Sequence, residues 1–466
     1  MKLAKIEITN FRCYESFTLE LQPDVNVIVG VNGAGKTTIL DAIAAALYDV
    51  VAANGGGGKR QRRRQEAELQ PSDIHISPGS TSTAVGRKDF VQFRASVFDF
   101  YEVPGFPNRT QTGQTAYLEW TDHIQYRPPA GFSYNTSQSE RLSPVYQYFA
   151  ALWQELRKSD PGALIPLPVV AYYRASRRLT DMPKMGDVFE LELSREGAFD
   201  RALNAGANFQ AMCQWFYLRE NAELREKMQR RQDPDYELPD LRAAREALRR
   251  TLEGVKRVFF DDNPPSLKIV LSTSGDADQV LELSQLSDGY RNLLALVMDF
   301  ARRLAQAHPN WPNPLEAPGI LLIDEIELHL HPRWQQTIIP NLQAAFPNTQ
   351  IIAATHSPEV LTTVRKENIH LLGSDHAIEQ LPADVGTFGA ESSRVLQEVF
   401  AAHARPQQIE TVQQLDEYLT LVESQQHDTD RGRELRAALE SALGRSDPDL
   451  QRADARISQL KVLGGR

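Results

Sequence analysis

The residues best suited to chemistry near the start of the chain lie in the run Gly30–Thr37, whose sequence is GVNGAGKT. This run matches the pattern GxxxxGK(S/T), in which glycines let backbone N–H groups wrap around phosphates. Lys36 is placed to neutralise the β- and γ-phosphates of ATP, and the Thr37 hydroxyl is placed to bind Mg²⁺. An apolar run precedes the motif and helical apolar spacing follows it, which is the context that such a loop requires. The residues predicted to bind the nucleotide here are Asn32, Gly33, Gly35, Lys36, Thr37 and Thr38.

Polar residues also follow two very apolar runs later in the chain. Gly319–Ile323 is followed by Asp324 and Glu325, and the run 351–355 is followed by His356. Ligands of parallel sheets bind at the carboxyl ends of strands, so we expect these side chains beside the phosphate loop. Asp324 suits the Mg²⁺ shell, and Glu325 suits a base that orients the attacking water. The imidazole of His356 is placed to hydrogen-bond the γ-phosphate or that water, although a lone histidine is more often structural.

A third candidate lies at the start of a long predicted helix. The segment Leu286–Tyr290 (LSDGY) puts Ser287 at the position of an N-cap. Free N–H groups at a helix N-terminus, a serine hydroxyl and Gly289 together make an anion site. Taken alone, this pentapeptide is an ordinary helix cap. Its place 37 residues before Asp324 (324 − 287) favours a nucleotide contact.

These four motifs, in this order, resemble the head of an ABC-type ATPase, with its Walker A, signature, Walker B and switch-histidine motifs. The opening Ile8–Arg12 (ITNFR) narrows the resemblance to the RecF/SMC/Rad50-like branch, in which Arg12 would lie near the bound phosphates. The resemblance covers roughly residues 1–50 and 280–375. It implies an α/β fold, namely a P-loop ABC-ATPase head with a helical signature lobe and a C-terminal helical appendage.

Such heads work in pairs. The Walker residues of one subunit face the signature motif of the other, so the resemblance implies a homodimer or higher even oligomer that ATP closes, with Ser287 and Gly289 in the shared sites. The commoner signature is LSGGQ, and here Asp288 and Tyr290 replace a glycine and the glutamine. A carboxylate near a γ-phosphate is repulsive unless it points away or meets a cation. The contact between subunits is therefore expected to be weaker or differently arranged.

Two further features of such heads are less well defined here. The usual Q-loop glutamine has no secure counterpart, and its candidate positions are Gln92, Gln125, Gln138 and the strand end at Tyr173–Arg174. His329 and His331 follow the two acids directly, but two ligands do not make a metal site. The resemblance favours a loop that meets the partner subunit.

Four segments are expected to position these residues. Residues 1–175 should form the first ATPase lobe with the Walker A motif, and 176–300 a helical lobe with the signature motif. Residues 301–375 should return to the ATPase core with the Walker B motif and the histidine, and 376–466 should form the helical appendage. Apolar residues recur at helical spacing in this last segment. They either pack onto the head or form a docking surface for a partner.

A closer resemblance is to the compact ATPases of Septu-type and retron-associated anti-phage systems. It is carried by LSDGYRNLLALVMDFARRLA, ILLIDEIELHLHPRWQQ and ATHSPEVL, and by a helical tail that ends near LGGR. In those systems the ATPase resembles a sensor or scaffold whose partner is a separate HNH nuclease. No HNH-like cluster is visible in this sequence, so we expect no nuclease activity of its own. The alternative is a RecF-like DNA-repair ATPase that binds DNA directly.

Composition narrows the partners further. The formal net charge is −10 over 466 residues, which does not favour nucleic acid because phosphate contacts need Lys and Arg. Positive charge is concentrated in Lys59–Arg64, which is either a solvated loop or a contact to an acidic partner, DNA or RNA/msDNA. Cys13 and Cys213 lie far apart, which fits a reducing, cytoplasmic compartment. No stretch of about 18 apolar residues stands out, so no membrane partner is expected.

Overall fold

The chain divides into two compact units, Met1–Ser392 and Ser393–Arg466, which are described separately in this computed structural model. The described residues are 1–54, 69–76, 88–104, 106, 110–112, 115–127, 131–134, 144–159, 163–175, 193–203, 209–229, 235–262, 265–272, 278–403 and 405–464. The basic run Lys59–Arg64 and the Q-loop candidate Gln138 lie outside them.

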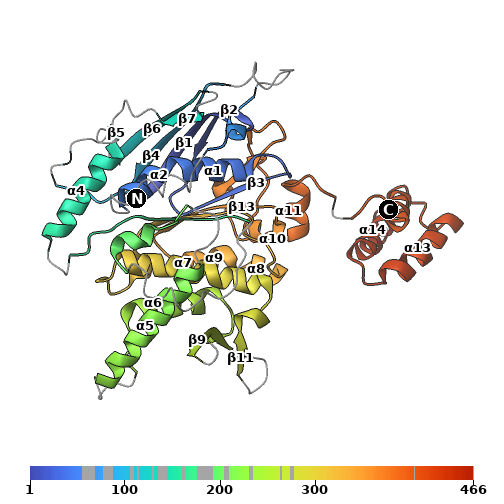
Figure 1. The fold of residues 1–466 in the computed structure, drawn as a ribbon. Helices are drawn as coiled ribbons and strands as arrows, with labels where there is room; N and C mark the ends of the chain where they lie inside the picture. The colour runs from blue at the N-terminus through green and yellow to red at the C-terminus, as the bar shows by residue number, and fades with distance from the viewer. Residues whose placement is uncertain are drawn as a thin grey trace. The chain divides into compact units, whose positions relative to one another are not determined.

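A mostly parallel sheet of six strands carries the candidate site, in the order β15-β14-β3-β13-β12-β8 (Figure 1). Its strands are β3 (Val25–Gly30), β8 (Val169–Tyr173), β12 (Gly319–Ile323), β13 (Thr349–Thr355), β14 (Ile369–Leu372) and the antiparallel edge strand β15 (Ile378–Glu379). All residues of β3, β8, β12 and β13 are buried, which explains their continuous apolar sequences. Because these strands are parallel, the residues that follow them meet at one edge of the sheet.

A second, antiparallel sheet has the order β2-β1-β4-β6-β5, with β7 paired to β6. Its strands are β1 (Lys2–Phe11), β2 (Tyr14–Glu20), β4 (Phe90–Phe98), β5 (Thr110–Thr112), β6 (Thr115–Arg127) and β7 (Gly131–Tyr134). Burial alternates along β4, as expected where one face of a sheet packs on a core. Helix α1 (Lys36–Ala46) packs against strands of both sheets, so the two sheets enclose the helix that follows the phosphate loop.

Helices α1 and α2 (Tyr48–Asn54) form one apolar stretch, Lys36–Asn54. By length and composition this stretch is able to cross a membrane, although 67% of its apolar window is buried inside the protein. An apolar stretch of this length was not expected from the sequence. Its apolar residues contribute to the core around the phosphate loop.

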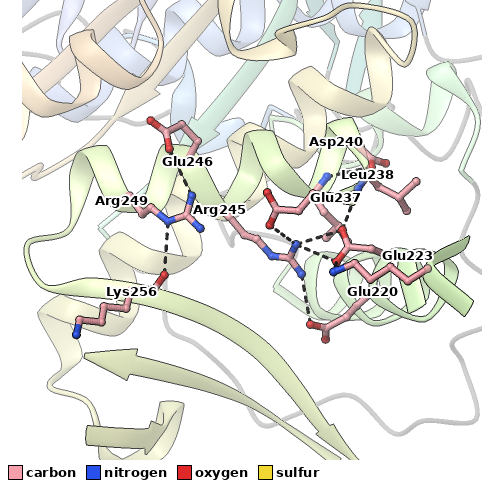
Figure 2. A network of polar contacts seen from close by, with 11 residues as sticks. Glu220, Glu223, Glu237, Leu238, Asp240, Arg245, Glu246, Arg249 and Lys256 are labelled. Carbon is pink, nitrogen blue, oxygen red and sulfur yellow. Dashed lines mark hydrogen bonds and ion pairs between the residues drawn. The ribbon is translucent and has the colours of Figure 1, made fainter. Parts of the chain in front are cut away.

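A helical lobe separates β8 from the signature region (Figure 1). It contains α5 (Phe209–Gln229), α6 (Pro239–Thr251) and a three-stranded antiparallel sheet of β9 (Val255–Asp262), β10 (Pro265–Leu271) and β11 (Gln279–Glu282). The buried Arg245 of α6 lies among Glu220, Glu223 and Glu237 (Figure 2). Its guanidinium nitrogens donate hydrogen bonds to the carboxylate oxygens of these three residues, at 3.5, 3.1 and 2.8 Å respectively. Removing one member of such a buried ion cluster is costly, so the cluster fixes α5 against α6.

Helix α7 (Asp288–Ala307) begins at the signature motif and crosses the core. In its middle, the buried Asp299 carboxylate accepts hydrogen bonds from Arg302, Arg303 and the Tyr173 hydroxyl, at 2.7, 2.9 and 2.8 Å. Burial raises the pKa of Asp299, but the charges of the two arginines outweigh it and lower the pKa to about 2. The signature helix is thereby connected to the carboxyl end of β8.

The first unit contains further short and long helices, namely α4 (Pro144–Lys158), α8 (Pro332–Gln335), α9 (Ile338–Ala345) and α10 (Pro358–Leu361). Helix α11 (Ser392–Glu398) begins at the boundary between the two units.

The second unit has a core of its own. It contains α12 (Glu410–Glu423), α13 (Asp430–Leu443) and α14 (Pro448–Gly464). Its core residues are Leu415, Tyr418, Val422, Leu435, Leu439, Leu450 and Ala453. The apolar spacing predicted for the tail therefore builds a separate three-helix core.

Candidate nucleotide site

The phosphate loop connects β3 to α1 and contains two glycines with left-handed backbone. The φ angle is 84° at Gly33 and 102° at Gly35, a region that favours glycine. A side chain at Gly35 would also collide with the Tyr14 hydroxyl. Helix α1 begins at Lys36 without a side-chain cap. Its first backbone N–H groups therefore lack a helical partner and suit an anion such as phosphate.

Lys36 lies within this loop and close to the acids that follow β12. Its Nζ donates hydrogen bonds to the carbonyl oxygens of Gly30 and Val31, at 2.9 and 3.0 Å. Burial lowers the pKa of the Lys36 ammonium group. The negative charges of Asp324 and Glu325 act in the opposite direction and raise it. The lysine and both predicted acids thus share one electrostatic neighbourhood, although they come from distant parts of the sequence.

The two residues predicted to bind Mg²⁺ are in direct contact. The Thr37 hydroxyl donates to the Asp324 carboxylate, at 2.9 and 3.2 Å from its two oxygens. Asp324 is buried, and its backbone N–H donates to the Tyr173 carbonyl at 2.9 Å. A hydroxyl and a carboxylate side by side are hard oxygen ligands that suit Mg²⁺. In the same loop and helix, Asn32 is exposed, and Thr38 lies in the first turn of α1.

The two glutamates after Asp324 have different surroundings. Glu325 has a φ of 46°, a left-handed conformation that costs roughly 1–3 kcal/mol outside glycine and that it shares with several other residues of this chain. Glu327 accepts hydrogen bonds from the Thr355 hydroxyl at 2.7 Å and from the backbone N–H of His356 at 2.6 Å. This contact of Glu327 with the residues that follow β13 was not predicted from the sequence. A third carboxylate in a loop expected beside the histidine was the only signal for it.

His356 lies where the sequence placed it, directly after β13 and next to the acidic loop. Its side chain is half-buried, and burial together with the charge of Lys36 lowers its pKa below the usual value. The carboxylates of Glu327, Glu325 and Asp324 oppose that shift. A neutral imidazole is therefore favoured at neutral pH, and it is able both to donate and to accept a hydrogen bond.

The signature residues lie at the exposed start of α7. Ser287 caps the helix by accepting a hydrogen bond from the Tyr290 N–H at 3.4 Å. Asp288 forms an ion pair with Arg291, which supplies the cation that a carboxylate near phosphate requires. Gly289, by contrast, is buried, and a side chain there would collide with the His329 carbonyl. Gly289 is thus in contact with the loop of its own head, whereas Ser287 is exposed.

The remaining predicted residues have other partners. The Arg12 guanidinium is paired with Asp41 and Asp73, at 2.6 and 2.8 Å. Gln92 and Gln125 lie in β4 and β6 of the antiparallel sheet, and not at a strand end of the parallel sheet. The remaining described candidate for the Q-loop position is the strand end at Arg174.

The loop of His329 and His331 follows the acids and leads into α8. His329 has a left-handed φ of 62°, and His331 caps α8 by accepting a hydrogen bond from the Arg333 N–H at 3.3 Å. Within the described ranges, no group of three or more His, Cys, Asp or Glu side chains could hold a metal ion. The contact that the structure shows for His331 is the cap at the start of α8.

The fold and the site together define the class of protein. A parallel sheet carries a phosphate loop, a Thr–Asp pair, a strained glutamate and a histidine along one edge, and a long helix begins at the signature motif. These are the parts of a P-loop ATPase with an ABC-type head. The α/β head predicted from the sequence is confirmed.

Comparisons with known proteins narrow this class. Residues 5–159 match a family model described as "AAA domain", and residues 184–362 match one described as "AAA domain, putative AbiEii toxin, Type IV TA system". The chain is 28% identical to the "Retron Ec83 probable ATPase" of Escherichia coli, over 97% of this chain and 85% of that protein. It is 25% identical to the "Retron Vc95 probable ATPase" of Vibrio cholerae serotype O1 biovar El Tor, over 84% of this chain and 79% of that protein.

A shorter match involves a Septu protein. Over 84 residues the chain is 45% identical to "Septu protein PtuA" of Bacillus mycoides (strain KBAB4), which covers 18% of this chain and 11% of that protein. The chain is thus similar along most of its length to the probable ATPases of two retrons and, over a short segment, to a Septu protein, which is the resemblance that the sequence predicted.

Proposed function

We propose that this chain is the regulatory ATPase of a bacterial anti-phage complex, in which two heads close around ATP and control a separate HNH-type nuclease. Similarity to two retron ATPases along most of the chain supports the setting. The observation that carries the switch is the arrangement of one head. Lys36, Thr37, Asp324, Glu325 and His356 share one strand edge, whereas Ser287 is exposed at the start of α7.

Within one head, each residue has a role that its position supports. Thr37 and Asp324 would hold Mg²⁺, which would neutralise negative charge on the phosphates. Lys36 would bind the same phosphates from the loop. Glu325 would orient the attacking water and accept its proton, and the neutral imidazole of His356 would hydrogen-bond the γ-phosphate. ADP and phosphate are the products.

Between heads, the exposed Ser287 of one subunit would complete the site of the other, and Gly289 would hold that helix against its own loop. ATP would then favour the closed homodimer, or a higher even oligomer, to the extent that it binds that state more tightly than the open one. Hydrolysis removes this preference and returns the nuclease to its other state. The proposed location is the cytoplasm, and the proposed partner is protein rather than membrane.

The test is to purify the chain from native cells, with half of each lysate treated with nuclease, and to identify partners by mass spectrometry. An HNH-type nuclease should remain after nucleic acid is digested. Its cleavage activity should differ between complexes that carry wild-type Glu325 and Glu325→Gln, which is expected to keep ATP bound. If DNA alone is recovered, and long duplexes stimulate hydrolysis by the purified chain, a RecF-like repair ATPase replaces this proposal. Loss of copurifying DNA, RNA or msDNA after treatment would show whether nucleic acid also belongs to the complex.

A further inference from the structure

Arg174 lies at the carboxyl edge of the parallel sheet, beside the Thr–Asp pair. Strands β8 and β12 pair in parallel with Tyr173 opposite Ile323, so Arg174 and Asp324 follow at the same edge. The Asp324 N–H donates to the Tyr173 carbonyl at 2.9 Å, which fixes this register. A guanidinium therefore follows the strand next to the one that delivers the metal-binding carboxylate.

The Asp41 carboxylate forms an ion pair with the Arg174 guanidinium. Asp41 lies on α1, about one helical turn after Thr37. Its carboxylate is paired with Arg174 at 2.8 Å and with Arg12 at 2.6 Å, and it accepts a hydrogen bond from the Tyr172 hydroxyl at 2.8 Å. The Asp41 side chain is only 7% exposed, whereas those of Arg174 and Arg12 are 40% and 32% exposed. A buried anion thus anchors two cations that reach solvent.

Two further contacts restrict the direction of Arg174. Its guanidinium lies over the Tyr172 ring, 5.2 Å from the centroid. Burial and the negative charges of Asp41 and Asp324 raise the pKa of the Tyr172 hydroxyl, because both carboxylates lie near this side chain. Because burying a carboxylate is costly unless it is paired, an acid at this position is explained by the cations that it orients.

We propose that Arg174 contacts the terminal phosphate of bound ATP, and that Asp41 is the positioning residue that holds its guanidinium there. The reason is that Lys36 lies in the phosphate loop, whereas Arg174 follows the strand next to Asp324, at the edge of the sheet that also carries Glu325, the candidate base for attack on the terminal phosphate. Arg174 thereby lies at the end of β8, which is one of the candidate positions for the Q-loop residue. The proposal rests on ATP binding alone, and not on the nuclease or on the pairing of heads.

The test measures equilibrium binding of ATP and of ADP, each with Mg²⁺, to the purified full chain carrying Glu325→Gln to slow hydrolysis. Adding Arg174→Ala should raise the Kd of ATP about tenfold or more, as for a lost charge-assisted contact, while the Kd of ADP changes less than about threefold. Asp41→Asn should act in the same direction. With Arg12→Ala present in every protein to remove the other partner of Asp41, the double variant Asp41→Asn/Arg174→Ala should be no weaker than Arg174→Ala alone, because Asp41 then acts through Arg174.

A matched control removes another partly buried arginine from an ion pair. Arg219 pairs with Asp240 at 2.5 Å in the helical lobe, with 28% of its side chain exposed, and Arg219→Ala should leave the ratio of ATP to ADP affinity unchanged. Should Arg174→Ala fail to fold, Arg174→Lys keeps the charge but loses the planar fork, and it should still lower that ratio at least about threefold. If the Arg174 variant that folds has the same ratio of ATP to ADP affinity as the Glu325→Gln protein without it, the proposed contact between Arg174 and the terminal phosphate is wrong. Additive effects of Asp41 and Arg174 would overturn the positioning role.

Discussion

Gly289 lies directly against the backbone carbonyl of His329, so that a single methyl group at Gly289 would overlap that oxygen. The first turn of the signature helix and the loop that follows Glu325 are therefore packed together within one head. This contact explains the glycine by close approach of two backbones. It also connects the first turn of α7, which the exposed Ser287 caps, with the loop that carries the candidate base.

Gly289→Ala should slow ATP hydrolysis about tenfold or more, because the loop of His329 must move and small displacements of catalytic groups have large effects on rate. ATP affinity should change less than about threefold, since Lys36 and Thr37 are not displaced. Steady-state hydrolysis and equilibrium binding measure the two effects. Gly386→Ala is the matched control, because a side chain there meets open space. Equal kcat values for the two variants would contradict the packing argument.

Glu327→Gln should lower kcat about tenfold while ATP still binds. The carboxylate accepts from both the Thr355 hydroxyl and the His356 N–H, and an amide is able to replace only one of those acceptors. The His356 loop would then lose its connection to the acidic loop, at the usual cost of one broken charge-assisted bond. Single-turnover hydrolysis separates this step from product release. Wild-type turnover would show that Glu327 does not position the histidine.

The composite site predicts a result from mixing two inactive proteins. Ser287→Arg should block closure because its bulky side chain stands where a γ-phosphate must approach, and Glu325→Gln should slow hydrolysis at least about 100-fold. In a mixed dimer, one site carries both changes and the other carries neither. Mixing should therefore restore part of the ATPase activity if heads exchange and the two sites are able to act separately. Normal hydrolysis by Ser287→Arg alone would exclude a shared site.

Asp299→Asn should lower the free energy of unfolding by about 3–5 kcal/mol, because it leaves Arg302 and Arg303 buried without a counter-charge. Urea unfolding at neutral pH is the measurement. The exposed Asp384 provides the control, since Asp384→Asn should stay within about 0.5 kcal/mol of the wild type. A small effect at Asp299 would mean that water or a neighbouring group replaces the lost charge.

Stability should fall as the pH is lowered from about 6.5 to 4. Burial lowers the pKa of both His308 and His370 to about 4, from an ordinary value of 6.5. The unfolded chain therefore binds protons across this interval while the folded protein does not, and each histidine contributes a loss of roughly 3 kcal/mol (6.5 − 4 = 2.5 units). Urea titrations at several pH values test this. His370→Asn should flatten the dependence, whereas the same change at the exposed His403 should not.

The residues that could be predicted from the sequence are those whose roles are set locally. The glycines and Lys36 belong to one continuous loop, and Asp324 directly follows its strand, so short patterns identify them. Asp41 and Arg174 escaped prediction as a pair because their contact depends on which strand lies beside β12 and on how α1 is packed. The link between Tyr173 and Asp299 spans 126 residues and likewise has no local signal.

Two residues predicted to bind nucleotide have contacts within the head that the sequence did not indicate, and their nucleotide contacts stay predictions. Gly289 was predicted to bind nucleotide, and its described contact is with the backbone of its own head. Arg12 was predicted beside the phosphates, and its guanidinium is paired with Asp41 and Asp73. A motif gives the residue types at a site, but two acids that compete for one arginine become visible only when their distances are known.

The second unit, Ser393–Arg466, buries its leucines against one another. The packing of its three helices therefore depends on contacts within this unit itself. In evolutionary terms, such a module is free to diversify, or to be exchanged between related chains, while the nucleotide machinery stays under constant selection. Lineages that share one hydrolytic head could in this way acquire different recognition properties.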